Sequence, residues 1–112
     1  MTAQLIPLQP AELAERMRND SAVLIDIREP DEFRRRHIPG AVSHPLSALD
    51  TARLDLDPKR DVVFTCGSGM RTSAACDRLA RAVRRPALVL EGGMNAWTAA
   101  GLPVAEGKAQ RR

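Results

Sequence analysis

The sequence contains few of the residues on which several common classes of protein depend. Among its 112 residues are two cysteines, one tryptophan, two phenylalanines and no tyrosine. Two cysteines are too few for a disulfide framework and have no histidine or cysteine partners at zinc-binding spacing, and so few aromatic side chains leave little on which nucleic-acid bases can stack. No apolar run approaches the roughly 18 residues of a membrane helix, and residues 1–10 lack the layout of a secretory signal. We therefore expect a cytoplasmic protein that binds neither a metal nor nucleic acid.

Positive charge is concentrated at the C-terminal end of the chain. The formal net charge is +3 at pH 7, from 17 lysines and arginines against 14 acidic residues. Residues 107–112 hold Lys108, Arg111 and Arg112 and no acid, so the charges of residues 1–106 balance. We expect one domain over residues 1–106, which is long enough to bury a core without disulfides, and a basic, disordered tail over residues 107–112.

Short apolar runs alternate with longer amphipathic ones, the pattern of an α/β domain with a parallel sheet. The apolar runs predict buried strands at residues 22–27, 61–65 and 87–90, with weaker candidates at 4–6 and 41–43. The amphipathic runs predict helices at residues 10–18, 71–84 and 92–100 and short helical turns at 31–35 and 46–52. Past Pro103 the chain is expected to be a loose tail.

The segment of residues 62–75 carries the features of a reactive site. A predicted strand ends at Cys66, a loop containing Gly67 and Gly69 follows, and a helix begins near Arg71. Ligands of parallel sheets bind beyond the carboxyl ends of the strands, and glycines allow backbone N–H groups to converge on one anion. A thiolate would be stabilised there, so Cys66 is a candidate nucleophile that needs no histidine base. The alternative is a buried cysteine before an ordinary glycine-containing turn.

The second cysteine, Cys76, lies on the apolar stripe of the helix predicted over residues 71–84. This position favours a buried structural thiol over a resolving or redox partner.

Four separated stretches resemble the rhodanese family. They are LIDIREPDEF at residues 24–33, HIPGA at 37–41, CGSGMRT at 66–72, and LEGGMNAW at 90–97 running into AGLPV at 100–104. Their order and spacing cover nearly the whole chain. The resemblance implies an α/β rhodanese-like fold, with a five-stranded, mainly parallel sheet flanked by helices on both faces and Cys66 at the base of a cradle-shaped loop.

The length of this loop separates two chemistries within the resemblance. Cys66 to Arg71 is six residues, the length in the sulfur-transferring members, whereas related phosphatases and arsenate reductases have one residue more. The resemblance therefore implies a thiosulfate sulfurtransferase, in which Cys66 takes a sulfane sulfur from thiosulfate or another persulfide donor and passes it to cyanide or a thiol. By the same resemblance we expect that no metal or organic cofactor takes part. The expected substrate-binding residues are Gly67, Ser68, Gly69, Met70, Arg71 and Thr72, with Asp26 and Arg28.

Several of these residues have a structural alternative. Asp26 and Arg28 follow a predicted strand and could bind the donor or orient the loop, but a fixed ion pair accounts for them equally well. We expect Glu32 to pair with an arginine, and by the resemblance His37 belongs to a structural turn.

Two departures from the family pattern bear on the donor. Gly67 stands where many sulfurtransferases carry a larger, often basic side chain, and Met70 adds an apolar side chain at the rim. Both weaken the case for thiosulfate as the physiological donor and leave room for a protein or low-molecular-weight persulfide.

A second hypothesis is a sulfur-carrier or regulatory rhodanese module that serves a partner protein and turns over small donors slowly. The C-terminal end resembles the exit from the rhodanese domain in bacterial proteins that continue into a membrane span, where basic residues flank the cytoplasmic side. This alternative therefore includes a membrane anchor if the native chain continues past Arg112. The sequence leaves open the donor, the acceptor, the oligomeric state, the pathway and the role of Cys76.

Overall fold

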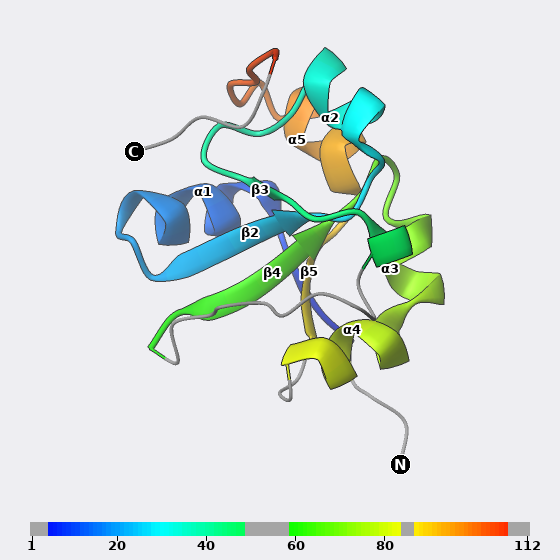
Figure 1. Cartoon of the computed structure of the whole chain (residues 1–112). Helices are drawn as coiled ribbons and strands as arrows, with labels where there is room; N and C mark the ends of the chain where they lie inside the picture. Colours follow the sequence, from blue (N-terminus) through cyan, green and yellow to red (C-terminus); the bar gives the residue numbers. More distant parts are fainter. Residues whose placement is uncertain (1–4, 49–58, 84–86, 108–112) are drawn as a thin grey trace.

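The computed structural model describes residues 5–48, 59–83 and 87–107, which form a parallel sheet with helices on both faces (Figure 1). The strands are β1 (Leu5–Leu8), β2 (Ala22–Asp26), β3 (Val42–Ser43), β4 (Asp61–Thr65) and β5 (Ala87–Leu90). The helices are α1 (Pro10–Arg18), α2 (Pro30–Arg35), α3 (Met70–Ala74), α4 (Cys76–Val83) and α5 (Gly93–Ala99), with a 3₁₀ turn η1 (Leu46–Ala48). The strand order is β1-β5-β4-β2-β3, and every pair is parallel. The expected fold class is confirmed.

The two central strands, β2 and β4, are buried on both faces because helices cover each side of the sheet. Leu24 pairs with Val63 and points to one face, whereas Ile25 pairs with Phe64 and points to the other. This double burial explains why both strands appear in the sequence as continuous apolar runs rather than as an alternation of apolar and polar residues.

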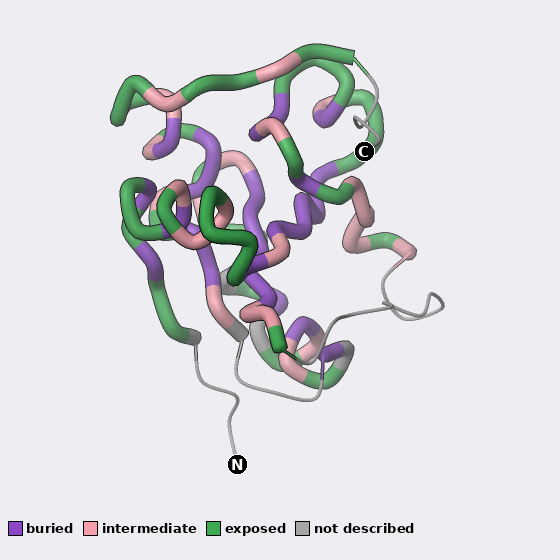
Figure 2. The backbone as a smooth tube through the Cα atoms, turned by 90° about the vertical axis from the view of Figure 1, so that its left-hand side faces the viewer, coloured by how far each residue is buried: buried purple, intermediate pink, exposed green. Residues whose placement is uncertain are grey.

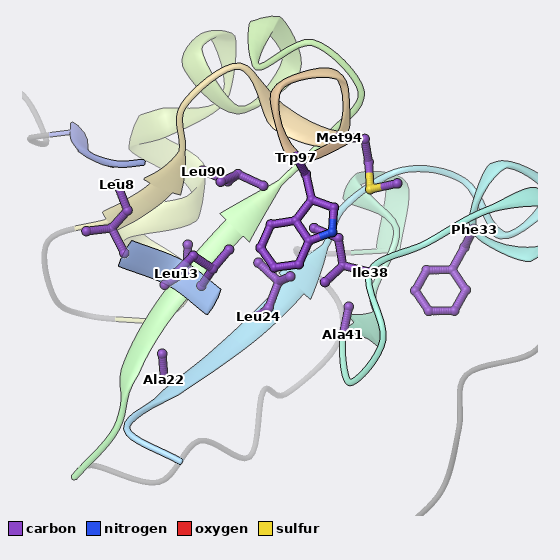
Figure 3. Close-up of a cluster of buried hydrophobic side chains, with 11 residues drawn as sticks. Leu8, Leu13, Ala22, Leu24, Phe33, Ile38, Ala41, Leu90, Met94 and Trp97 are labelled. Atoms are coloured by element: carbon purple, nitrogen blue, oxygen red, sulfur yellow. The ribbon is translucent and has the colours of Figure 1, made fainter. Parts of the chain in front are cut away.

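Each face of the sheet has its own hydrophobic core. On one face α1, α2 and α5 contribute Leu13, Phe33, Met94 and Trp97, and Figure 3 shows Trp97 lying between Leu13 and Ile38. On the other face α4 packs through Leu79 and Val83. In Figure 2 the buried residues run through the middle of the molecule and the exposed ones lie around its outside. The sheet is thus covered by packed side chains on both faces.

The prediction of one helix over residues 71–84 is wrong, because the structure divides this segment at Ala75 into α3 and α4. The side chain of Thr72 turns back to the loop and donates to the carbonyl of Gly69 at 2.8 Å. Leu79 and Val83 instead pack on the sheet. The helix α3 therefore supports the loop, whereas α4 packs into the core. Of the turn expected at residues 46–52, Leu46–Ala48 is helical and the remainder lies outside the described residues.

The loose tail expected past Pro103 is wrong for the residues up to Gly107. Ala105 forms an antiparallel bridge with His37, in which each backbone N–H donates to the other carbonyl at 2.9 and 2.8 Å. The N–H of Gly107 donates to the carbonyl of Arg34 at 2.7 Å. These bonds attach residues 104–107, named here the C-terminal strap, to α2 and the turn after it. Residues 108–112 lie outside the described part, so the basic tail stays a prediction.

The described helices are all short, and the longest, α1, has nine residues. None of them has the length and apolar character needed to cross a bilayer.

Candidate active site

Cys66 directly follows β4, at the carboxyl end of a central strand. Its side chain is buried, with 1% of its surface exposed. The ends of β2 and β5 flank it, since β4 pairs with both. Cys66 therefore lies at the edge of the sheet where sites in parallel α/β proteins are formed.

The loop after Cys66 curls so that a backbone amide faces the sulfur. The N–H of Gly69 donates to Cys66 Sγ at 3.1 Å, and Thr72 Oγ1 lies 3.9 Å from the same sulfur. Gly69 has a φ of +94°, a conformation that glycine adopts readily and other residues rarely do. The structure places the N–H of Gly69 at the sulfur, and the convergence of successive N–H groups of the loop on one anion stays a prediction.

The first turn of α5 holds the same loop from behind. The N–H groups of Met94 and Asn95 donate to the carbonyls of Cys66 and Gly67, each at 2.9 Å. Gly93 makes this approach possible, because a Cβ at that position would lie 2.5 Å from the carbonyl oxygen of Cys66. The sequence indicated only a tight turn at Gly92 and Gly93. Their role in supporting the loop follows from the contact between the start of α5 and the loop in the structure.

Arg71 turns over the rim of the loop to Glu32 of α2. Its Nη1 and Nη2 donate to the two carboxylate oxygens at 2.8 and 2.9 Å, which confirms the expected arginine partner of Glu32. The hydrogen bond from Arg71 lowers the pKa of Glu32 to about 2, and the bond to Glu32 raises the pKa of Arg71, with a smaller contribution from the charge of Cys66. The guanidinium lies above Gly67, where a Cβ would be 3.6 Å from Nη2.

Asp26 and Arg28 form a buried ion pair. Arg28 donates from Nε to Asp26 Oδ1 at 3.0 Å and from Nη2 to Oδ2 at 2.7 Å, and Nη2 also donates to the carbonyl of Arg36 at 2.7 Å. Of the two alternatives left open by the sequence, these contacts match the fixed ion pair. The pair braces the segment that leads from β2 through α2.

Two further candidates are not in the loop. His37 is buried, stacks on Phe33 with ring centroids 3.9 Å apart, and is hydrogen-bonded through Nδ1 to the carbonyl of Phe33 at 2.9 Å. The expected structural role of His37 is therefore confirmed. The side chain of Cys76 lies outside the described part, so its role stays a prediction. Among the residues that the structure describes, no three histidine, cysteine or acidic side chains gather as a metal site.

A cavity of about 710 Å³ opens beside the loop. Ser68, Met70 and Thr72 line it from the loop, and the end of β5 with Glu91 lines it from the other side. Met70 is 75% exposed, so its side chain stands at the entrance as expected for a rim residue. The cavity gives a reactant space directly next to the loop that surrounds Cys66.

Known proteins are similar to this chain in both sequence and fold. The rhodanese-like domain model matches residues 9–100. An uncharacterised Synechocystis protein is 36% identical over 92% of this chain, and the match spans 58% of that protein's length. A sulfurtransferase of Allochromatium vinosum is 35% identical over 76% of this chain and 79% of its own length. A rhodanese-related protein of Thermoplasma volcanium superposes with a TM-score of 0.77 at 26% identity, covering 89% of this chain and 97% of that one. The chain belongs to the rhodanese family.

Proposed function

We propose that this protein is a sulfurtransferase that carries sulfane sulfur as a persulfide on Cys66. The observation that carries the proposal is the 3.1 Å hydrogen bond from the Gly69 N–H to Cys66 Sγ at the base of a tightly curled loop. A donor aimed at the sulfur stabilises negative charge there, and a thiolate is the reactive form of cysteine. Membership of the rhodanese family and the sulfurtransferase among the relatives support sulfur transfer in general.

In the first half-reaction the Cys66 thiolate attacks the outer sulfur of the donor. With thiosulfate, the new bond is Cys66 S–S, the bond that breaks is the S–S bond of thiosulfate, and its electron pair leaves with sulfite. Two negative charges enter with thiosulfate and two leave with sulfite, so the persulfide keeps the single charge of the thiolate. The N–H of Gly69 lies 3.1 Å from Cys66 Sγ, and we propose that the amides of residues 67–72 together hold the persulfide.

In the second half-reaction a thiophilic acceptor removes the outer sulfur. Cyanide forms a C–S bond and leaves as thiocyanate, while the electron pair of the S–S bond returns to Cys66 as the thiolate. A thiol acceptor becomes a persulfide in the same way. Neither half-reaction needs an external oxidant, a metal or an organic cofactor. Because Cys66 has to remain a thiolate or persulfide between turnovers, we also propose a reducing compartment, the cytoplasm.

A second candidate function is a sulfur carrier that delivers the persulfide to a partner protein. The size of the cavity favours it, because about 710 Å³ is within the range of pockets that enclose drug-sized molecules and is more than a small anion needs. The cavity would admit the thiol-bearing loop of an acceptor protein next to the loop that surrounds Cys66. The two candidates share the Cys66 persulfide and differ in how fast small molecules turn over.

Intact mass tests the proposal directly. After incubation with thiosulfate the protein should gain one sulfur, roughly 32 Da, and should lose it again on addition of cyanide, because the persulfide forms on an activated thiolate. The Cys66→Ser variant should never show the gain. The Cys76→Ser variant is the matched control and should load sulfur as the parent does.

The outcomes separate the two candidates. Rapid loading and release with thiosulfate and cyanide supports the enzyme, whereas loading without release to cyanide supports the carrier. Sulfur that still appears in Cys66→Ser, or no loading with either thiosulfate or a low-molecular-weight persulfide, contradicts a Cys66 persulfide.

A further inference from the structure

The charged groups around the Cys66 loop disfavour the binding of a donor that carries two negative charges. Arg71 is the basic side chain of the loop, and Glu32 binds it through both Nη atoms. Gly67 contributes no side chain. On the opposite side Glu91 lines the cavity and accepts a hydrogen bond from Gln9. The arginine next to the loop is thus already paired with a carboxylate, and among the described residues that line the adjoining cavity Glu91 is a second carboxylate and none is basic.

The position of Arg71 is set by two neighbours together. Glu32 lies on α2, which follows β2, and its carboxylate fixes the guanidinium as a two-pronged pair, the strongest arrangement of this type. Gly67 leaves the space in which the guanidinium lies, because a Cβ there would already be in van der Waals contact at 3.6 Å. A longer side chain at position 67 would reach the guanidinium. Glu32 and Gly67 thus together determine where the guanidinium of Arg71 lies.

We infer that Glu32 is a specificity-determining residue that acts through Arg71. By binding the guanidinium, Glu32 lowers the affinity of the site for dianionic donors such as thiosulfate. The affinity for donors of lower charge that carry an apolar body is lowered less. Coulomb attraction to a free guanidinium is twice as large for a dianion as for a monoanion at the same distance. The inference rests on the proposed function, since it names the class of donor that the Cys66 site selects.

The cavity next to the loop fits an apolar donor body. Met70 stands at its entrance, and Pro7, Val89 and Leu90 contribute to its wall. These side chains offer contact area to a hydrocarbon group but no cation to an anion. The sulfur to be transferred would point to Cys66 while the rest of the donor lies on this wall.

Two donors with the same reacting sulfur test the inference. Thiosulfate is a dianion, whereas benzenethiosulfonate is a monoanion in which a phenyl ring replaces one oxygen. Thiocyanate formation is measured with each donor at a fixed cyanide concentration, for the parent chain and for Glu32→Gln. Glutamine keeps the shape of the side chain and its acceptor for the Glu29 N–H, which bonds Glu32 Oε1 at 3.1 Å.

We expect Glu32→Gln to lower the KM for thiosulfate by about tenfold, the effect of one additional charge-assisted contact. The KM for benzenethiosulfonate should change by less than about threefold, because its single charge is attracted less by the guanidinium once the negative charge at position 32 is removed. The kcat with either donor should stay within about twofold, since the reacting groups are unchanged. A loss of folding would instead lower kcat with both donors alike.

Two further variants show whether the effect passes through Arg71. Asp31→Asn removes a negative charge from the neighbouring residue of α2, where Asp31 pairs with Arg34 at 2.6 Å, and it should leave both KM values unchanged. Glu32→Gln combined with Arg71→Gln should lose the gain for thiosulfate. A gain that persists in this double variant would overturn the inference, and would point to the nearby cavity lined by Arg35 and Arg36.

A binding measurement separates failure of the inference from failure of the proposed function. Thiosulfate is titrated by calorimetry into Cys66→Ser and into Cys66→Ser with Glu32→Gln, neither of which can react. Tighter binding by about tenfold in the double variant supports the inference even if the parent transfers no sulfur. Equal binding in the two variants, or an unchanged KM for thiosulfate in Glu32→Gln, overturns it even if the parent is a fast sulfurtransferase.

Discussion

At the scale of single residues, the environment of Cys66 depends on glycines that let backbones approach. Gly69 turns its N–H to the sulfur at 3.1 Å, and Gly93 lets the start of α5 contact the carbonyls of Cys66 and Gly67. A Cβ at Gly93 would clash with the Cys66 carbonyl oxygen at 2.5 Å, and Gly69 has a φ of +94°, which other residues rarely adopt, so the shape of the site depends on both glycines.

The pair Gly93 and Gly101 tests this interpretation. Both have a positive φ, +59° and +76°, but a Cβ on Gly93 would lie 2.5 Å from the Cys66 carbonyl oxygen while a Cβ on Gly101 would meet nothing within 4 Å. Gly101→Ala should cost about 1 kcal/mol of folding free energy, from backbone strain alone. Gly93→Ala should cost about 3 kcal/mol, because overpacking adds to the strain.

Urea unfolding gives both free energies, and sulfur loading followed by mass gives the effect on the site. Displacing the loop in Gly93→Ala should slow loading by about 100-fold, whereas Gly101→Ala should load at the rate of the parent. Equal effects of the two substitutions on loading would contradict a specific role of Gly93 in shaping the loop.

At the scale of secondary-structure elements, the ion pair of Glu32 and Arg71 joins α2 to α3. Glu32 also accepts the N–H of Glu29 at the start of α2, so one carboxylate both caps its own helix and holds the neighbouring one. The two side chains are 36% and 43% exposed, and water screens their attraction. The pair therefore orients Arg71 more than it stabilises the fold.

Acid should weaken this connection in a defined range of pH. The pKa of Glu32 is about 2 in the folded protein and 4.5 in the unfolded reference. A carboxyl group with a lowered pKa adds stability that is fully present above pH 4.5 and is lost as the pH falls toward 2. The parent should thus be more stable than Glu32→Gln at pH 7 by up to about 1 kcal/mol, and the difference should shrink as the pH approaches 2 and vanish below it.

Thermal or urea unfolding of both proteins at several pH values measures this difference. The Asp31→Asn variant shows the part that is due to any lost charge on α2. A gap between the parent and Glu32→Gln that stays constant from pH 7 to pH 2 would mean that ionised Glu32 does not contribute through its pair with Arg71.

At the scale of the whole molecule, the site is formed by segments that are distant in the sequence. The parallel sheet brings the ends of β2, β4 and β5 to one edge, which places α2, the Cys66 loop and the start of α5 around the sulfur. The C-terminal strap adds a further link, because it is hydrogen-bonded to His37 and to the carbonyl of Arg34. It thereby ties the chain beyond α5 to the helix that carries Glu32.

Shortening the chain tests the contribution of the strap. A chain that ends at Pro103 lacks the two bonds between His37 and Ala105 and the bond from Gly107 to Arg34. Compared with a chain that ends at Gly107, it should lose about 1–3 kcal/mol of unfolding free energy, as expected for a few backbone hydrogen bonds. Urea unfolding of the two chains measures the difference, and equal midpoints would show that the strap does not stabilise the domain.

The elements whose pattern is local could be predicted from the amino-acid sequence. The strands at residues 61–65 and 87–90 and the helix at residues 10–18 have the predicted bounds, because apolar runs buried on both faces and an amphipathic stripe after Pro10 require no knowledge of distant contacts. The same holds for Cys66 at a strand end before a glycine loop. Local signals failed at Ala75, where the helix divides, since the continuous pattern does not show that Thr72 belongs to the loop.

The partner of each charged group depends on the tertiary fold. The sequence allowed Asp26 and Arg28 to be either donor-binding residues or an ion pair, and only the buried geometry places them on each other. The sequence also could not show that Arg71 binds Glu32, 39 residues away, or that the strap reaches His37. Such pairings depend on where the sheet brings distant segments together, and electrostatic and hydrogen-bond energies depend on that distance rather than on order along the chain.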